Sequence, residues 1–246
     1  MTGSNLFNNP LLTSSNTLNG LFQPIISTSG TFTIPDGTTV SLWNPNTSSF
    51  DTTATFTNGS WSADLKLPPG TGALVFAPRP FTNTIIGEAL DHNGIPMMNN
   101  VPIPPPTLFS GPDGIYLLGD KAPFIDTGTN IFLNIIGRIP YVGEKVMLLS
   151  GTSTYLGNGT WDSIPAIGLG QAAFLTIMSE PPPALTIVSS NSQTIVAWPP
   201  SASPWTLQTN SDLANGTWGD YAGLIINNTV TNPAAAGNLF FRLSYP

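Results

Sequence analysis

The sequence has no cysteine, little charge and only one histidine, His92. Without thiols the chain forms neither disulfides nor thiolate metal sites, and its redox compartment cannot be inferred. Charged residues make up 8% of the 246 residues, against about 25% in ordinary soluble domains. Only six residues are Lys or Arg, too few for a patch that follows a phosphate backbone. Nucleic acid is therefore excluded as a partner, and an anionic membrane surface is disfavoured.

Long apolar runs and helical periodicity are also missing. No apolar stretch approaches the ~20 residues that a membrane helix needs, so membrane insertion is not expected. Residues 1–5 lack the basic and apolar regions of a signal peptide. We expect a chain that is either already processed or not exported by the usual route.

The sequence is rich in turn residues and in short β-forming runs. Gly and Pro, 24 and 25 residues, interrupt the chain every few positions. Between them lie runs rich in β-branched and aromatic residues, several with alternating polarity. This pattern predicts an all-β fold of the sandwich or barrel type. Two helical turns are expected, over 16–22 and 129–136, each after Ser, Thr, Asn or Asp residues that would cap it.

An internal repeat is the most informative feature of the chain. Five blocks occur twice in the same order, at 5–11, 16–22, 34–43, 58–61 and 67–76, and again at 116–123, 129–137, 139–149, 158–161 and 167–175. In both copies Asn-Gly precedes Ser or Thr and then Trp, which predicts a tight turn closing a hairpin. We predict two copies of one β-rich unit, and the sequence leaves open whether they form one domain or two.

Composition shifts divide the chain into four predicted segments. The first β-rich unit spans 1–86, a Pro-rich extended linker or crossover spans 87–113, and the second unit spans 114–180. The linker contains Pro102-Ile103-Pro104-Pro105-Pro106, which favours an extended chain. A C-terminal module spans 181–246, where six expected strands favour a small immunoglobulin-like or fibronectin-like β-sandwich.

Two stretches resemble known bacterial proteins. The string 205–209, followed by Trp218 and by 240–243, resembles a module that ends many secreted proteins of Verrucomicrobia and related bacteria. The paired units resemble a second, uncharacterised β-rich family of the same bacteria, through blocks such as Pro35-Asp36-Gly37-Thr38. The second unit departs from that pattern where Leu149-Ser150 replaces Trp43-Asn44. The resemblance implies an extracellular or cell-surface protein and supplies no catalytic residue.

Three tryptophans are the candidate binding residues: Trp43, Trp61 and Trp161. They would present sugar-stacking faces, although β-sandwich cores also use Trp. Asp64 and Asp162 lie shortly after two of them, which fits either a binding feature or a solvated loop. His92 is expected in the linker, without a functional role. No catalytic residue, cofactor or metal site is predicted, with Ca²⁺ on scattered oxygen ligands as the remaining alternative.

These features lead to three hypotheses of different classes. The first is a non-catalytic structural or cell-surface protein that assembles with copies of itself into a filament or layer through β-strand contacts. The second is a carbohydrate-binding module array that uses exposed Trp on a polysaccharide. The third is a hydrolase of the glycoside type, which needs two carboxylates converging in a cleft.

Overall fold

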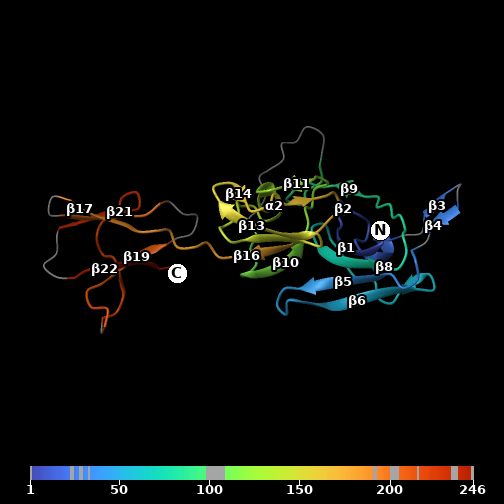
Figure 1. Ribbon diagram of the computed structural model, residues 1–246, viewed down its shortest axis with the longest axis horizontal. Helices are drawn as coiled ribbons and strands as arrows, with labels where there is room; N and C mark the ends of the chain where they lie inside the picture. The colour runs from blue at the N-terminus through green and yellow to red at the C-terminus, as the bar shows by residue number, and fades with distance from the viewer. Residues whose placement is uncertain are drawn as a thin grey trace. The chain divides into compact units, whose positions relative to one another are not determined.

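The computed structural model describes residues 2–22, 25–27, 30–32, 34–97, 109–190, 193–199, 205–214, 216–233 and 238–244. The chain divides into two compact units, Met1–Ser179 and Glu180–Pro246. It is mostly β, with several antiparallel sheets (Figure 1), so the predicted fold class is confirmed at that level. The Pro-rich run 102–106, the centre of the predicted linker, lies outside the described residues. No helix in the described ranges is long and apolar enough to cross a membrane.

Two five-stranded sheets form the body of the first unit, and both have the same strand order. Every pairing in them is antiparallel. The first sheet has the order β1 (Gly3–Asn8), β8 (Gly72–Ala77), β5 (Thr39–Asn44), β6 (Ser49–Thr57) and β7 (Ser60–Trp61). The second has the order β10 (Gly114–Leu118), β16 (Ala173–Ile177), β12 (Lys145–Leu148), β13 (Gly151–Gly157) and β14 (Thr160–Trp161).

Three two-stranded pairs complete the described β-structure of this unit. They join β2 (Leu11–Leu12) to β9 (Glu88–Ala89), β3 (Ile25–Ser27) to β4 (Gly30–Phe32), and β11 (Asp126–Thr127) to β15 (Ala166–Ile167). The strand β9 falls inside the predicted linker, so part of that segment is paired rather than free. It packs against the start of the chain because Leu11 pairs with Ala89.

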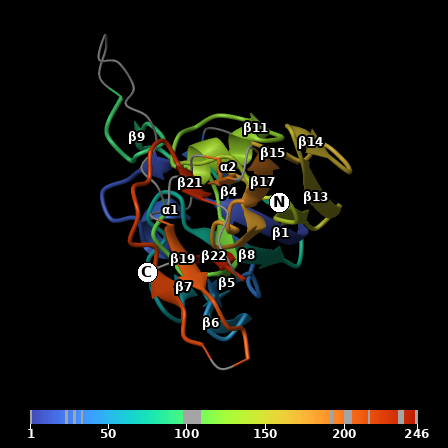
Figure 2. The same cartoon turned by 90° about the vertical axis from the view of Figure 1, so that its left-hand side faces the viewer.

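The predicted hairpin turns are confirmed in both sheets. Asn58 and Gly59 have φ of 51° and 81°, and Asn158 and Gly159 have φ of 51° and 77°. Both turns therefore use the left-handed region that Asn and Gly tolerate, which suits the twist of the strands they join. The strands β13 and β14, which the second turn joins, lie side by side in two views (Figures 1 and 2).

Both predicted helical turns are present, as α1 (Leu18–Leu21) and α2 (Asn130–Ile135). Each buries apolar side chains against its sheet, so packing rather than helix propensity holds these short turns. The predicted side-chain caps are wrong, because neither Thr17 nor Thr129 makes a capping hydrogen bond. In α1 the carboxylate of Asp64, 45 residues away, instead accepts the N–H of Asn19 at 2.8 Å.

The two sheets meet through matching backbone hydrogen bonds. The N–H of Asn8 donates to the carbonyl of Gly170 at 2.8 Å, and the N–H of Gly119 donates to the carbonyl of Gly70 at 3.1 Å. The registers of β1 on β8 and of β10 on β16 make these pairs counterparts. An apolar cluster around Leu6, Leu117 and Ala172 fills the contact. The two sheets therefore belong to one compact unit.

The C-terminal unit contains two three-stranded antiparallel sheets. Their orders are β17 (Thr186–Ser190), β18 (Gln193–Ala197), β21 (Thr229–Pro233), and β20 (Gly219–Asp220), β19 (Thr206–Asn210), β22 (Phe240–Ser244). Buried Val196, Trp198, Leu207 and Val230 form a core with residues from both sheets. In this arrangement β17 is an edge strand that pairs with β18 alone among the described strands.

Candidate functional site

Trp61 and Trp161 occupy equivalent places, each on the short return strand of an Asn-Gly hairpin. Each indole contacts one ring from the hairpin and one from the helical turn or its end. The partners are Phe56 at 5.2 Å and Phe22 at 5.8 Å for Trp61, and Tyr155 at 5.2 Å and Phe132 at 6.2 Å for Trp161, measured between ring centroids. Both indoles therefore help to join hairpin and helix, and their role in sugar binding stays a prediction.

Trp43 lies where the two sheets meet. Its Nε1 donates to the carbonyl of Ile115 at 2.7 Å, and its ring packs edge-on to Phe50 and Phe174 at 5.2 and 4.8 Å. The counterpart position in the second sheet holds the smaller Leu149, which lines a pocket of about 390 Å³ together with Ser150 and residues of β1. The structure therefore places the three predicted tryptophans apart rather than in one site.

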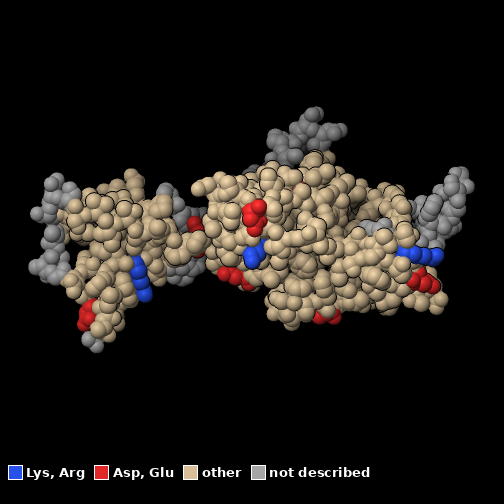
Figure 3. Space-filling model, in the orientation of Figure 1, with Lys and Arg blue, Asp and Glu red and all other residues tan. Residues whose placement is uncertain are grey.

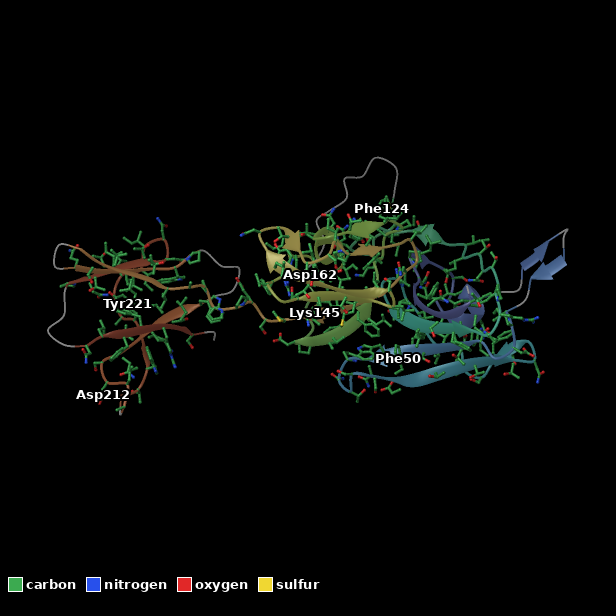
Figure 4. The ribbon with its side chains drawn as sticks, in the orientation of Figure 1. Phe50, Phe124, Lys145, Asp162, Asp212 and Tyr221 are labelled. Carbon is green, nitrogen blue, oxygen red and sulfur yellow. The ribbon has the colours of Figure 1, made fainter. Side chains whose placement is uncertain are left out.

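The two aspartates near these tryptophans accept hydrogen bonds from backbone N–H groups, Asp64 from Asn19 in α1 and Asp162 from Thr154 in β13. Slight burial acts to raise the pKa of Asp64, but hydrogen bonds from Asn19 and Thr17 outweigh it and lower the pKa. The pKa of Asp162 is lowered by the backbone N–H of Thr154, which it accepts at 2.8 Å (Figure 4). Both carboxylates are used to fix local backbone.

His92 lies in an ordered hydrogen-bond network, and the absence of a functional role stays a prediction. It follows β9 in a tight turn, where the N–H of Gly94 donates to the carbonyl of Asp91 at 2.9 Å. Its Nδ1 lies 3.0 and 2.8 Å from the two carboxylate oxygens of Asp120. Its ring also contacts that of Phe124, with 5.6 Å between the ring centroids; Phe124 is labelled in Figure 4.

Asp126 extends this network to α2, which lies beside β11 in Figures 1 and 2. Its Oδ1 accepts the side-chain N–H of Asn134 at 2.6 Å. The pKa of Asp126 is raised to about 6, mainly by burial and in part by the neighbouring Asp120, against the lowering effects of Asn134 and His92. Its Oδ2 is buried without a hydrogen-bond partner, which fits a carboxyl that holds a proton next to Asp120.

A pocket of about 220 Å³ adjoins this network. Its lining includes His92, Lys121 and Asn134, the turn Pro69-Gly70-Thr71, and the apolar side chains of Phe109, Leu118 and Ile135. Asp120 and Asp126 are only 4% and 3% exposed and do not line it. The hydrolase hypothesis requires two carboxylates in an open cleft, and this converging pair is closed off from the pocket.

Glu144 is another buried carboxylate, and both of its oxygens accept hydrogen bonds. Glu144 is 0% exposed and accepts hydrogen bonds from Arg138 at 2.6 and 2.7 Å, from the N–H of Tyr141 at 2.7 Å and from the N–H of Met178 at 2.8 Å. The guanidinium stacks on the Tyr141 ring at 3.9 Å. Glu144 occupies the position that buried Thr38 has in the first sheet. Each follows a glycine, Gly143 or Gly37, whose backbone N–H donates to a carbonyl of the long hairpin strand. This ion pair is structural.

No local pattern in the sequence indicates the His92 network. Asp120 lies 28 residues from His92, in the segment after β10, so their contact depends on how β9 packs. Within the described ranges, no group of three His, Asp or Glu side chains could hold a metal ion. No protein-family model matches the chain, and neither the curated proteins nor the solved structures contain a match to it.

Proposed function

We propose that the chain is a non-catalytic extracellular or cell-surface structural protein that assembles with copies of itself through β-strand contacts. In this proposal the two sheets of the first unit are related copies, and the C-terminal unit is an immunoglobulin-like or fibronectin-like module. The resemblance to secreted bacterial proteins supports export. The repeated positions are turns and core residues, which a scaffold needs.

The edge strand β17 carries the proposal. Ile187 and Val188 are 54% and 51% exposed on successive positions, so both faces of this strand present apolar side chains. An exposed apolar edge with unpaired backbone groups is a template for pairing with another chain. Charged side chains or proline, which usually protect such edges, are missing from Thr186–Ser190.

The rest of the surface suits close packing between copies. Large apolar side chains are strongly exposed, from Leu169 at 61% to Ile86 at 85%, and the others in this range are Ile125, Val142, Ile164 and Leu224. On the face shown in Figure 3, charged side chains form small separate spots. With a net charge of −7 spread over 246 residues, electrostatic repulsion between copies is weak.

The test is self-association measured by light scattering and negative-stain imaging over a series of concentrations. The wild-type chain is expected to form larger species as concentration rises. Val188→Lys places a charge on the edge strand and should shift assembly to higher concentration, because Lys opposes strand pairing. Thr57→Lys, which adds the same charge at an exposed position of β6, is the matched control. Wild-type particles that stay monomeric at every concentration would refute the proposal.

A further inference from the structure

The pocket beside His92 gathers two of the few basic groups in the chain. The whole sequence has six Lys and Arg and one His, yet both Lys121 and His92 line this pocket of about 220 Å³. In such a sparsely charged protein, two adjacent bases at one concave site are unlike the isolated charges elsewhere on the surface. Their placement points to a ligand with negative charge.

Lys121 is held in place by its aliphatic stem. The stem passes close to Gly70, where an added Cβ would lie 2.9 Å from Cγ, and close to Gly94, where it would lie 3.3 Å from Cδ. Side chains at either position would crowd the lysine. Lys121 is half-buried, whereas Lys66 and Lys145 are exposed. The described contacts give Lys121 no ion pair, so its ammonium is available to a ligand.

Asp120, which lies beside Asp126, orients the ring of His92. Because Nδ1 faces the carboxylate of Asp120 at 2.8 Å, this nitrogen carries the proton that is donated there. The imidazole is thereby fixed with Nε2 as its second polar atom. A base whose ring is fixed by a buried carboxylate is better preorganised for binding than a freely rotating surface side chain.

The other residues that line the pocket indicate the chemistry of the rest of the ligand. Phe109, Leu118 and Ile135 are apolar, and Phe109 is itself fixed by an edge-on contact with Tyr116 at 4.9 Å. Apolar walls favour an organic body over an inorganic ion. The single ammonium of Lys121 suits one carboxylate, whereas a dianion would be repelled by the negative charge of Asp120 beside His92.

We propose that this pocket binds a small organic monocarboxylate, whose oxygens accept from the Lys121 ammonium and whose apolar body lies against Phe109, Leu118 and Ile135. This site is independent of the assembly proposed above. A volume of about 220 Å³ limits the ligand to roughly the size of a single ring with its carboxylate, because drug-sized ligands fill pockets of about 300 Å³ or more.

Binding should strengthen on acidification. The titratable groups around His92 are Asp91 in its own turn, Asp120 and Lys121 from the segment after β10, and Asp126 on β11. The turn 68–71 contributes no titratable group, and α2 contributes the neutral Asn134. Protonation of Asp126, whose pKa burial raises to about 6, removes a negative charge near the site. Affinity for an anion should therefore be higher at about pH 5.5 than at about pH 8.

Benzoate is a suitable probe, with benzamide as its neutral counterpart of the same shape. Titrations of the full chain followed by ¹H–¹⁵N NMR should show saturable shifts at Lys121, His92 and Asn134 with benzoate. Benzamide should bind at least about tenfold more weakly, as expected for loss of a charge-assisted hydrogen bond. Lys121→Met keeps the aliphatic stem and should lower benzoate affinity about tenfold.

Two further variants separate binding from folding. Lys121→Arg retains the charge and should retain benzoate binding, while Lys145→Met removes an exposed lysine and should bind as the wild type does. Equal affinity for benzamide and benzoate would overturn the proposal. So would an unchanged affinity in Lys121→Met, or the absence of saturable shifts at the pocket up to the solubility limit of benzoate.

Discussion

Asp126→Asn should stabilise the protein at neutral and alkaline pH. Asp126 is 3% exposed and lies next to a second buried carboxylate, Asp120, so its charged form is disfavoured in the fold. An asparagine has the shape of the protonated acid. It would keep an oxygen for the Asn134 side chain, which now donates at 2.6 Å, and would offer its own N–H to Asp120.

The size of the effect follows from the two pKa values of Asp126. Its pKa rises from 3.8 in the unfolded chain to about 6 in the fold, mainly through burial. The folded state then holds the proton more tightly, so acid favours folding. This stabilisation is complete below pH 3.8 and is lost as the pH rises through about 6. The difference corresponds to at most about 3 kcal/mol.

The assay is urea denaturation of wild type and Asp126→Asn between about pH 4 and about pH 8, followed by tryptophan fluorescence. Both units contain Trp, so independent unfolding would give two transitions, of which only that of Met1–Ser179 should shift. The variant should match the wild type near pH 4, where both side chains are neutral. It should exceed the wild type by up to about 3 kcal/mol near pH 8.

Asp162→Asn is the matched control, and its effect on stability should be nearly constant between about pH 4 and about pH 8. The N–H of Thr154 lowers the pKa of Asp162, so that carboxylate contributes stability that is lost as the pH falls through its folded-state pKa below 3.8. If Asp126→Asn lowers stability equally at every pH, the aspartate does not hold a proton in the fold and the reasoning is refuted.

Two further substitutions test how the first unit is held together, both by thermal denaturation of the full chain. Gly72→Ala should lower the free energy of unfolding by about 1–3 kcal/mol, because an added Cβ would lie 2.7 Å from the backbone oxygen of Leu117. Gly219→Ala, at a position with open space around it, should change stability little. An equal loss of stability in both variants would contradict close packing of the two sheets. Arg138→Met leaves the fully buried Glu144 without its cation and should lower the free energy of unfolding by about 3–5 kcal/mol. Lys66→Met, at an exposed lysine, should leave stability unchanged. An Arg138→Met chain as stable as the wild type would show that the ion pair contributes little.

Local sequence was sufficient for the strands, turns and repeat. Asn58-Gly59 and Asn158-Gly159 were predictable because few residue pairs tolerate the positive φ that a tight hairpin needs. The helical turns were predictable from their apolar spacing, but their caps were not. The N–H of Asn19 is accepted by Asp64, and no local pattern shows a partner 45 residues away.

The tryptophans show the same limit at the candidate site. Their position after Asn-Gly predicts a return strand, but only packing against rings such as Phe22 and Phe132 shows how each indole is used. Leu149 in place of Trp43 was visible as a departure between the repeats. The pocket beside Leu149 became apparent only when β1 was placed next to it.

The sequence by itself determined an all-β chain with two similarly ordered segments, because alternation, turn residues and repeated blocks act over a few residues at a time. The tertiary structure alone decided that both sheets share one unit, through bonds such as that from Asn8 to Gly170. It also brought His92 to Asp120 and Lys121 to the same pocket. Those contacts depend on how β9 and β10 pack. The charge state of Asp126 is set by burial and by its distance from other charges, and both exist only in the folded chain.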